Sequence, residues 1–150
     1  MVIKRIETQE ELDAAWQLRK DVFVDEQNVP VSEELDDLDQ VPTTIHVLAA
    51  DEEGPTATGR ILLDGPGRVH LGRICVAKRT RGTGLGRILM SELERIATEE
   101  YSADGKLTID LSAQDSALGF YGRLGYEIID DRRYLDAGIW HRDMRKIVAR

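Results

Sequence analysis

A glycine-rich segment near the middle of the chain is the clearest candidate for chemistry. It reads Arg79-Thr80-Arg81-Gly82-Thr83-Gly84-Leu85-Gly86-Arg87 and lies between a predicted strand and a predicted helix. Glycine allows positive φ and lets a ligand approach the main chain closely. Main-chain N–H groups at the start of a helix bind anions, and arginine suits phosphate oxygens. The segment therefore predicts a phosphate-binding turn.

This turn differs from two common phosphate-binding loops. It lacks the Gly-Lys followed by Ser or Thr that a Walker A loop requires. The strands predicted before it are joined by hairpins, whereas a dinucleotide-binding fingerprint opens a βαβ unit. From these residues alone, a turn without a ligand and a plain phosphate or nucleotide site stay open as alternatives.

Charge is distributed unevenly around the turn. The chain holds 20 Lys and Arg against 28 Asp and Glu, which gives a formal net charge of −8. No Lys or Arg occurs between Asp21 and Gly59, whereas the stretch from Arg73 to Arg87 contains five basic residues and no acid. The pattern is common on solvated surfaces, but it also fits a polyanion site beside a site for a cation. The pI of about 4.9 argues against nucleic-acid binding.

Length and composition set further limits. A chain of 150 residues has the size of a single domain. Cys75 is the only cysteine, so a reducing, cytoplasmic environment is expected. No apolar run approaches the roughly 20 residues of a membrane-spanning helix, and no Cys/His cluster has the spacing of a metal site. The excess of acid, with 15 arginines against 5 lysines, also suggests a halophilic adaptation.

The elements that must position the turn alternate along the chain. Strands are predicted at residues 2–6, 43–50, 56–63, 68–76, 107–111, 125–129 and 139–147. One helix follows Thr8, an N-cap that forms a capping box with Glu11, and an acidic helix is predicted from Ser32 to Asp39. Further helices are predicted at residues 85–101 and 115–124. Hairpins join the first strands and helices join the later ones, which predicts an α/β domain with a mixed sheet (α+β).

A second segment, residues 113–126, makes the pattern more specific. It contains Phe120, Tyr121, Gly125 and Tyr126. Together the two segments resemble the GNAT superfamily of N-acetyltransferases, with its R/Q-x-x-G-x-G/A loop and its F-Y-x-x-x-G-F/Y segment. The likeness runs from Val2 to about Lys146 and implies one N-acetyltransferase domain over residues 1–150. It also implies a mostly antiparallel sheet of six to seven strands flanked by about four helices.

The front half of the chain narrows this resemblance. The segment Val22–Pro30 reads VFVDEQNVP. It is similar to a group of bacterial and archaeal acetyltransferases whose substrate is unsettled. It also has a distant likeness to acyl-homoserine-lactone synthases, which share the fold.

The resemblance implies acetyl-CoA as the co-substrate and assigns residues to it. Ile74, Cys75 and Val76 would line the pantetheine arm, with the Val76 N–H as the donor to the oxyanion. The pyrophosphate would be held by the turn residues Arg81, Gly82, Thr83, Gly84, Leu85, Gly86 and Arg87. Arg79 would reach the 3′-phosphate or the adenosine. Many relatives have Asn where this chain has Gln114. The amide group is retained, but the distance that it reaches toward the pantetheine arm differs.

The resemblance points to Tyr121 as the donor of a proton to the leaving thiolate. A tyrosine that only packs beside Phe120 is the alternative. The base that deprotonates the amine stays open among six residues: Glu26, Glu34, Asp36, Asp39, His46 and His70. We favour a glutamate of the 26–34 segment, with His46 second. Cys75 has no adjacent histidine and is expected to be a buried bystander rather than a nucleophile.

The predicted function is an acetyl-CoA-dependent N-acetyltransferase in which a primary amine attacks the thioester directly in a ternary complex. A small-molecule amine is the expected partner, with no nucleic acid, membrane or metal, and similar proteins are commonly homodimers. A non-catalytic CoA-binding regulatory module is one alternative. An acyltransferase with a longer acyl donor is another.

Overall fold

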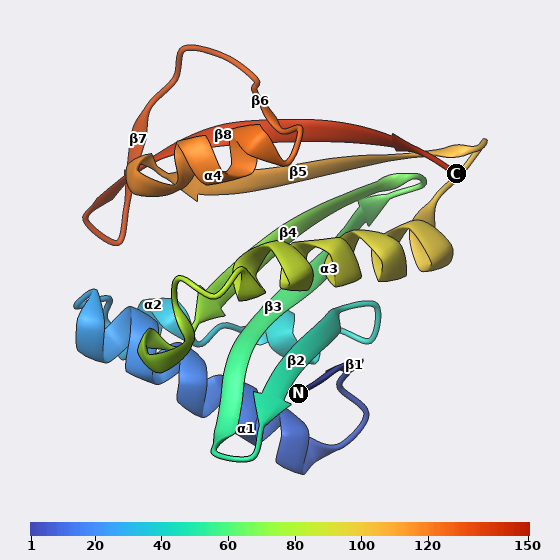
Figure 1. Ribbon diagram of the computed structural model, residues 1–150. Coiled ribbons are helices and arrows are strands. Elements are labelled where there is room, and N and C mark those ends of the chain that lie inside the picture. The colour runs from blue at the N-terminus through green and yellow to red at the C-terminus, as the bar shows by residue number, and fades with distance from the viewer.

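The computed structural model describes all 150 residues and is built around one eight-stranded sheet (Figure 1). The strands are β1 Val2–Arg5, β2 Ile45–Asp51, β3 Gly54–Gly65, β4 Arg68–Val76, β5 Lys106–Gln114, β6 Glu127–Ile128, β7 Tyr134–Asp136 and β8 Ile139–Ala149. Their order is β1-β2-β3-β4-β5-β8-β6, with β7 also paired to β8. Only the β4–β5 pair is parallel. The predicted mixed, mostly antiparallel sheet is confirmed.

Four α-helices accompany the sheet, as expected. They are α1 Gln9–Arg19, α2 Val31–Glu34, α3 Leu85–Tyr101 and α4 Leu118–Arg123. A π-helix, Lys20–Glu26, continues α1, and short 3₁₀ turns cover Asp37–Gln40, Lys78–Thr80 and Asp115–Ala117. The capping box of α1 is present, because the Thr8 hydroxyl accepts from the Glu11 N–H and the Glu11 carboxylate accepts from the Thr8 N–H. No helix is both long and apolar enough to cross a bilayer.

The acidic helix predicted from Ser32 was wrong in its extent. The helix stops after one turn and is preceded by Pro30 rather than capped by Ser32. The carboxylates of Glu34 and Asp39 both bind Arg19. Five residues apart on a continuous helix they would point about 140° away from each other. The chain leaves the helical conformation after Glu34, and both carboxylates can therefore reach the Arg19 guanidinium.

The hairpin of β7 and β8 was missed as well. The expected last strand corresponds to β8, but β7 has only three residues, too few to show an alternating pattern. Ala137 and Gly138 connect the two strands with φ values of 52° and 78°. Two consecutive positive φ values are typical of a tight hairpin turn.

Helices cover both faces of the sheet. On β3, Ala57 and Ile61 pack in the main core together with the apolar side of α3, while Thr58 and Arg60 project from the opposite face. That opposite face is the one covered by α1, whose Arg19 shares Asp39 with Arg60. Helix α4 lies on the same side of the sheet as α3, over β5 (Figure 1).

The sheet divides between β4 and β5. These strands pair only where Arg68–Leu71 lies beside Thr108–Leu111, and beyond this they diverge. Two residues of β4, Arg73 and Ile74, stand opposite a single residue of β3, so β4 bulges, and Arg73 has a φ of 52°. In Figure 1 the strands β1 to β4 and the strands β5 to β8 form two halves that open away from each other. This divergence positions the candidate site.

Candidate active site

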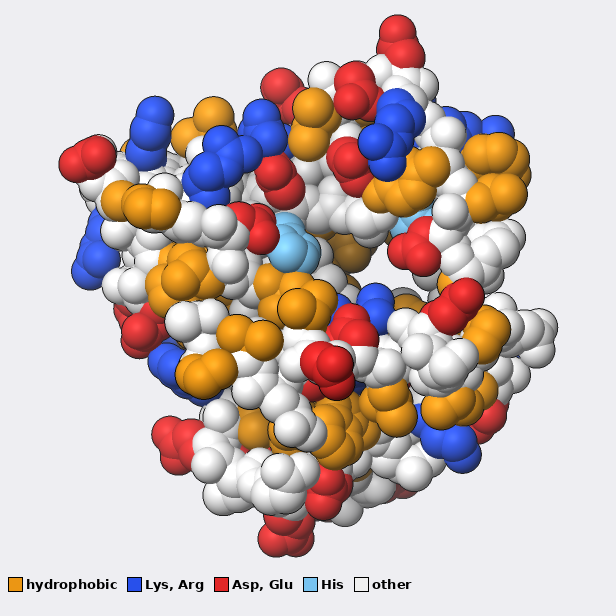
Figure 2. All heavy atoms as spheres, turned by 180° about the vertical axis from the view of Figure 1, so that it is seen from behind, with side chains coloured by type: hydrophobic (Ala, Val, Ile, Leu, Met, Phe, Trp, Pro, Cys, Tyr) orange, Lys and Arg blue, Asp and Glu red, His pale blue; other side chains and the backbone are white.

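A cleft of about 640 Å³ lies where β4 and β5 diverge. This volume is within the range of small-molecule binding sites. Figure 2 shows a hollow in the surface on this side of the molecule, bordered by apolar, acidic, basic and histidine side chains. Six of the predicted coenzyme-binding residues line the cleft: Ile74, Cys75, Val76, Arg81, Gln114 and Tyr121.

The main chain of Val76 turns its polar groups away from β3. The next residue, Ala77, donates its N–H to the Thr56 carbonyl at 2.7 Å, so the alternation of the ladder directs the groups of Val76 to the other edge. Consistent with this, the Val76 carbonyl accepts a hydrogen bond from Arg81 Nε at 3.1 Å. The N–H and C=O of one strand residue point the same way, so the Val76 N–H faces the cleft as an unpaired donor.

The glycine-rich turn has the conformation of an anion site. Gly82 and Gly84 have φ values of 80° and 83°, and α3 begins immediately after them without a side-chain cap. The N–H groups of its first turn are therefore available to a ligand. Gly86 allows close packing, because a Cβ there would lie 3.3 Å from the Phe120 ring. Arg87 is exposed and forms no ion pair.

The other two arginines of the turn have partners within the chain. Arg81 forms two hydrogen bonds to the carboxylate of Glu26, at 2.8 and 3.1 Å. Arg79 binds Asp51 at 2.7 Å and Glu53 at 2.9 Å, so it points to the β2–β3 turn and does not line the cleft. A phosphate that engaged either arginine would have to compete with these carboxylates.

Tyr121 reaches the cleft from α4. Its ring contacts Phe120 and Tyr126 edge to face, and its hydroxyl forms no hydrogen bond within the chain. Burial raises the pKa of Tyr121 to about 12. Burial also raises the pKa of Cys75 to about 12, so this thiol is not a ready nucleophile.

Gln114 reaches across the opening between the two halves of the sheet. Its Nε2 donates to Oε1 of Gln27 at 2.9 Å, and both side chains line the cleft. Gln27 belongs to the segment that follows the π-helix. The two amides therefore join the two halves of the sheet at the cleft, and Gln114 would lie beside a group bound along β4.

The three preferred candidates for the general base, Glu26, Glu34 and His46, all contact other polar groups of the chain. Glu34 lines the cleft but is 2% exposed, and its carboxylate is 2.6 Å from Arg19 Nε. Glu26 is bound to Arg81. His46 lies outside the cleft, with Nε2 at 3.0 Å from the Asp39 carbonyl, and burial lowers its pKa. The structure brings none of them to the cleft with a free side chain.

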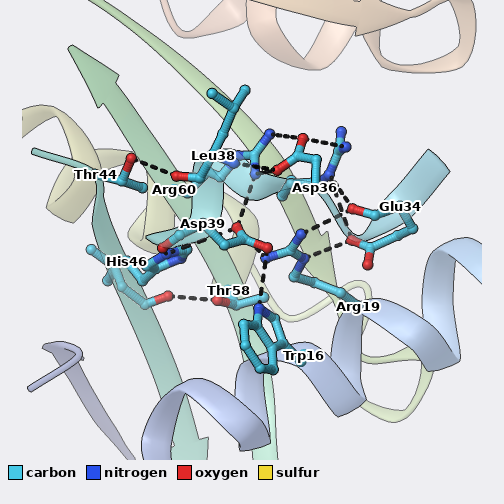
Figure 3. A network of polar contacts seen from close by, with 12 residues as sticks. Trp16, Arg19, Glu34, Asp36, Leu38, Asp39, Thr44, His46, Thr58 and Arg60 are labelled. Carbon is cyan, nitrogen blue, oxygen red and sulfur yellow. Dashed lines mark hydrogen bonds and ion pairs between the residues drawn. The ribbon is translucent and has the colours of Figure 1, made fainter. Parts of the chain in front are cut away.

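Asp36 and Asp39 belong to a network of ion pairs beneath the cleft (Figure 3). Asp39 lies 2.8 Å from Arg19 and 2.9 Å from Arg60, and Asp36 lies 2.7 Å from Arg60 and 3.2 Å from Arg73. Hydrogen bonds from Arg60 lower the pKa of Asp36. Burial alone would raise the pKa of Asp39, but the donors of Arg19 and Arg60 bring it below its ordinary value. The network holds in place the segment that brings Glu33 and Glu34 to the cleft.

Several cleft residues were missed by the sequence analysis. His141 and Asp143 of β8, Ser112 of β5 and Asp136 of β7 all line it. The alternation of His141 and Asp143 along the final strand was an available signal. His70, an open candidate, also lines the cleft, but its Nδ1 is 2.7 Å from Asp64. No group of three or more His, Cys, Asp or Glu side chains is arranged to hold a metal ion.

Comparison with known proteins identifies the family. The family described as "Acetyltransferase (GNAT) domain" matches residues 14–148. The chain belongs to this GNAT family. A Bacillus subtilis (strain 168) protein described as the uncharacterized N-acetyltransferase YjcF is 40% identical over 139 residues, covering 92% of this chain and 94% of the relative. The expected superfamily is thereby confirmed.

Solved GNAT-like structures agree with the fold. The crystal structure of an acyl-CoA N-acyltransferase from Pseudomonas aeruginosa superimposes with a TM-score of 0.85 at 33% identity, covering 97% of this chain and 98% of that one. An aminoglycoside 6′-N-acetyltransferase complexed with coenzyme A gives a TM-score of 0.77 at 16% identity, covering 100% and 99%. The second likeness concerns the fold alone. The expected GNAT fold is confirmed.

Proposed function

We propose that this GNAT protein is an acetyl-CoA-dependent N-acetyltransferase that acetylates a primary amine of a small molecule by direct attack in a ternary complex. One observation carries the proposal. The cleft between β4 and β5 has the unpaired Val76 N–H on one side and the Tyr121 hydroxyl on another, so a hydrogen-bond donor is available for each atom that gains negative charge.

The chain offers a continuous path for the coenzyme. The N-terminus of α3, with Gly82 and Gly84 before it, would bind the pyrophosphate, and the exposed Arg87 would add a positive charge. The diverging edge of β4 would take the pantetheine arm, with Gln114 beside it. The similar fold of an N-acetyltransferase complexed with coenzyme A supports this placement.

The reacting groups would be held by two donors. The Val76 N–H would bind the thioester oxygen, and one such donor is worth roughly 10²–10³ in rate. As the amine nitrogen bonds to the carbonyl carbon and the carbon–sulfur bond breaks, Tyr121 would give its proton to the departing sulfur. The raised pKa of Tyr121, about 12, keeps this proton on the phenol at neutral pH.

Carboxylates line the part of the cleft where the amine would bind, and they favour a cationic substrate. Glu33 and Asp136 line it with exposed carboxylates that form no ion pair, and Asp143 lies deeper in the same wall. Such groups attract an ammonium ion electrostatically. This supports an amine that arrives protonated and must lose a proton before it attacks.

Two measurements test the proposal. Titration calorimetry should show binding of CoA, and Arg87→Gln should weaken it by about tenfold, the size of one charge-assisted contact. Lys20→Gln is the matched control, because Lys20 is also exposed and unpaired but lies on the π-helix. Release of free thiol from acetyl-CoA should then appear with at least one member of a panel of primary amines.

Each alternative gives a different result. Binding of CoA without acetylation of any amine would indicate a regulatory module. Faster turnover with longer acyl-CoA donors would indicate a different acyl group. Absence of CoA binding by the wild-type protein contradicts the proposal altogether.

A further inference from the structure

One histidine of the cleft takes part in neither the oxyanion contact of Val76 nor the proton transfer of Tyr121. His141 in β8 stands directly opposite Gln114 of β5 and also opposite Tyr134 of β7. Opposite residues of antiparallel strands project from the same face with Cβ atoms about 5 Å apart. His141 therefore lies beside the amide at which we place the pantetheine arm, in the wall that an acceptor must pass.

The hydrogen bond of one ring nitrogen fixes the proton on His141. Its Nδ1 is 2.7 Å from the carbonyl oxygen of Ile139. A carbonyl oxygen can only accept, so Nδ1 carries the hydrogen. In a neutral imidazole the other nitrogen, Nε2, then has a lone pair. No group of the chain donates to this Nε2, and the side chain lines the cleft.

Neighbouring side chains hold the ring in place. The Tyr134 ring stacks on the His141 ring, with centroids 6.0 Å apart and an interplanar angle of 19°. The Tyr134 hydroxyl is tied to Asp143 Oδ1 at 2.6 Å and also contacts the Ser112 hydroxyl. The Arg132 guanidinium covers the Tyr134 ring at 4.7 Å. His141 is thus fixed on two sides, whereas Nε2 stays free.

Several other acid–base groups of the cleft already have partners, whereas the free carboxylates of Glu33 and Asp136 are exposed to solvent. His70 is paired with Asp64, and Glu34 with Arg19. Asp110 is bound by Arg145 at 2.6 Å. Among the histidines that line the cleft, His141 is the one without a carboxylate partner.

We infer that His141 is the general base of the proposed acetyl transfer, with Nε2 as the atom that accepts a proton from the substrate ammonium. The inference rests on the proposed function. The substrate nitrogen loses two protons on the way from ammonium to amide. One passes to His141 Nε2 and then to solvent. The other balances the proton that Tyr121 gives to the thiolate sulfur, so acetyl-CoA and the ammonium yield the amide, CoA thiol and one released proton.

The charged and titratable groups around His141 come from several elements. They are Tyr134 and Asp136 on β7, Asp143 on β8, Asp115 with its partner Arg133 next to the end of β5, and Tyr121 on α4. Protonation of Nε2 would remove the lone pair that accepts the substrate proton. A loss of kcat/KM on the acid side of the pH profile is therefore expected in the wild-type protein.

The test is the pH profile of kcat/KM for the amine in wild type and in His141→Asn. The Asn Nδ2 can replace Nδ1–H as donor to the Ile139 carbonyl but provides no base. We expect a loss of about 10²- to 10⁴-fold near neutral pH. The loss should shrink as the pH rises and free amine accumulates, and the acid limb assigned to His141 should vanish. CoA affinity and melting temperature should stay near the wild-type values.

A second variant and a spectroscopic measurement make the result decisive. His70→Asn removes the other cleft histidine and should keep the acid limb. Nitrogen-15 NMR of the wild-type ring should show His141 protonated on Nδ1 at alkaline pH, and protonation on Nε2 instead overturns the inference even if the variant fails to fold. If the wild type is active and the His141→Asn variant keeps both the rate and the acid limb, the assignment of the base to His141 is wrong. That result would leave the proposed function standing. A wild type that acetylates no amine overturns the proposed function, and the base with it.

Discussion

At the level of single residues, burial supports a catalytic role for Tyr121 and argues against one for Cys75. It raises the pKa of both side chains to about 12, so both keep their protons at neutral pH. A protonated phenol is a proton donor, whereas a protonated thiol is a poor nucleophile. The same physical effect therefore supports direct transfer assisted by Tyr121 and disfavours an acyl-enzyme on Cys75.

Removal of one hydroxyl tests this assignment. Tyr121→Phe keeps the ring and its edge contacts with Phe120 and Tyr126 but leaves no proton to donate. We expect kcat to fall by about 10²-fold or more, the usual contribution of a positioned acid, with CoA affinity unchanged. Steady-state kinetics and calorimetry measure the two effects separately.

Tyr126→Phe is the matched control for this variant. Its hydroxyl donates to Glu94 at 3.3 Å, on the α3 side and outside the cleft. Turnover in this control should stay within about twofold of wild type, because the hydroxyl is remote from the reacting atoms. Equal turnover in wild type and Tyr121→Phe would remove Tyr121 from the mechanism.

Residues in continuous motifs could be predicted from the sequence, whereas residues brought together by strand pairing could not. The glycine turn and Tyr121 each lie in a local segment whose spacing is visible. His141 faces the cleft only because β8 pairs with β5 in one register, and a shift of one residue would turn it to the other face. Glu34 and His46 have suitable chemistry, but the fold engages them in the ion-pair network and its surroundings.

At the level of elements, the π-helix is tied to the phosphate turn. Glu26 is the last residue of this helix, and its carboxylate forms an ion pair with Arg81. π-Helical segments often occur at functional sites. The pair therefore links the segment around Gln27, which lines the cleft, to the place where we put the pyrophosphate.

Loss of the Glu26 charge should strengthen coenzyme binding. A partly exposed ion pair contributes about 0.2–1 kcal/mol. Glu26→Gln removes this competition for Arg81, so the affinity for CoA should rise by up to about fivefold. Calorimetric titrations of both proteins measure the difference. Asp25→Asn is the control, since Asp25 is exposed and unpaired. Weaker binding in Glu26→Gln would show that Glu26 assists the coenzyme instead.

A comparison of α3 with the acidic segment after Pro30 shows when sequence periodicity is sufficient to predict an element. Helix α3 has a continuous apolar stripe over 17 residues and occupies the predicted range 85–101. The acidic segment after Pro30 carries a helix-forming composition, yet its shape is set by Arg19, Arg60 and Arg73 from other elements. Buried charges must be paired, and this requirement overrides local propensity.

At the level of the whole molecule, the network joins α1, the 31–40 segment, β3 and β4 around buried charges. Removing one partner of such a network leaves a buried charge uncompensated. Protonation has the same consequence, because it converts the carboxylate of Asp36 or Asp39 to a neutral acid beside arginines. Global stability should therefore depend on pH through these groups and through the neighbouring His46.

Two windows of pH dependence are expected for the free energy of unfolding. The folded-state pKa of His46 is lowered, so below about pH 6.5 the unfolded chain takes up a proton that the folded one does not, and stability falls. The folded-state pKa values of Asp36 and Asp39 are also lowered, so their contribution is present above about pH 4 and is lost as the pH falls further. Stability should be flat between about pH 7 and 8, where neither His46 nor the two aspartates change protonation.

Urea unfolding at pH 8, 7, 6, 5 and 3.5 measures both windows, in wild type and in His46→Gln. The Gln amide can still donate to the Asp39 carbonyl, as His46 Nε2 does, but does not titrate. Its curve should therefore be flatter than the wild-type curve between pH 6.5 and 5, where a single group changes stability by at most about 1.4 kcal/mol per pH unit. Below pH 4 the two proteins should lose stability in parallel, because Asp36 and Asp39 are present in both. An unchanged slope between pH 6.5 and 5 would show that His46 accepts its proton in the folded protein as readily as in the unfolded chain.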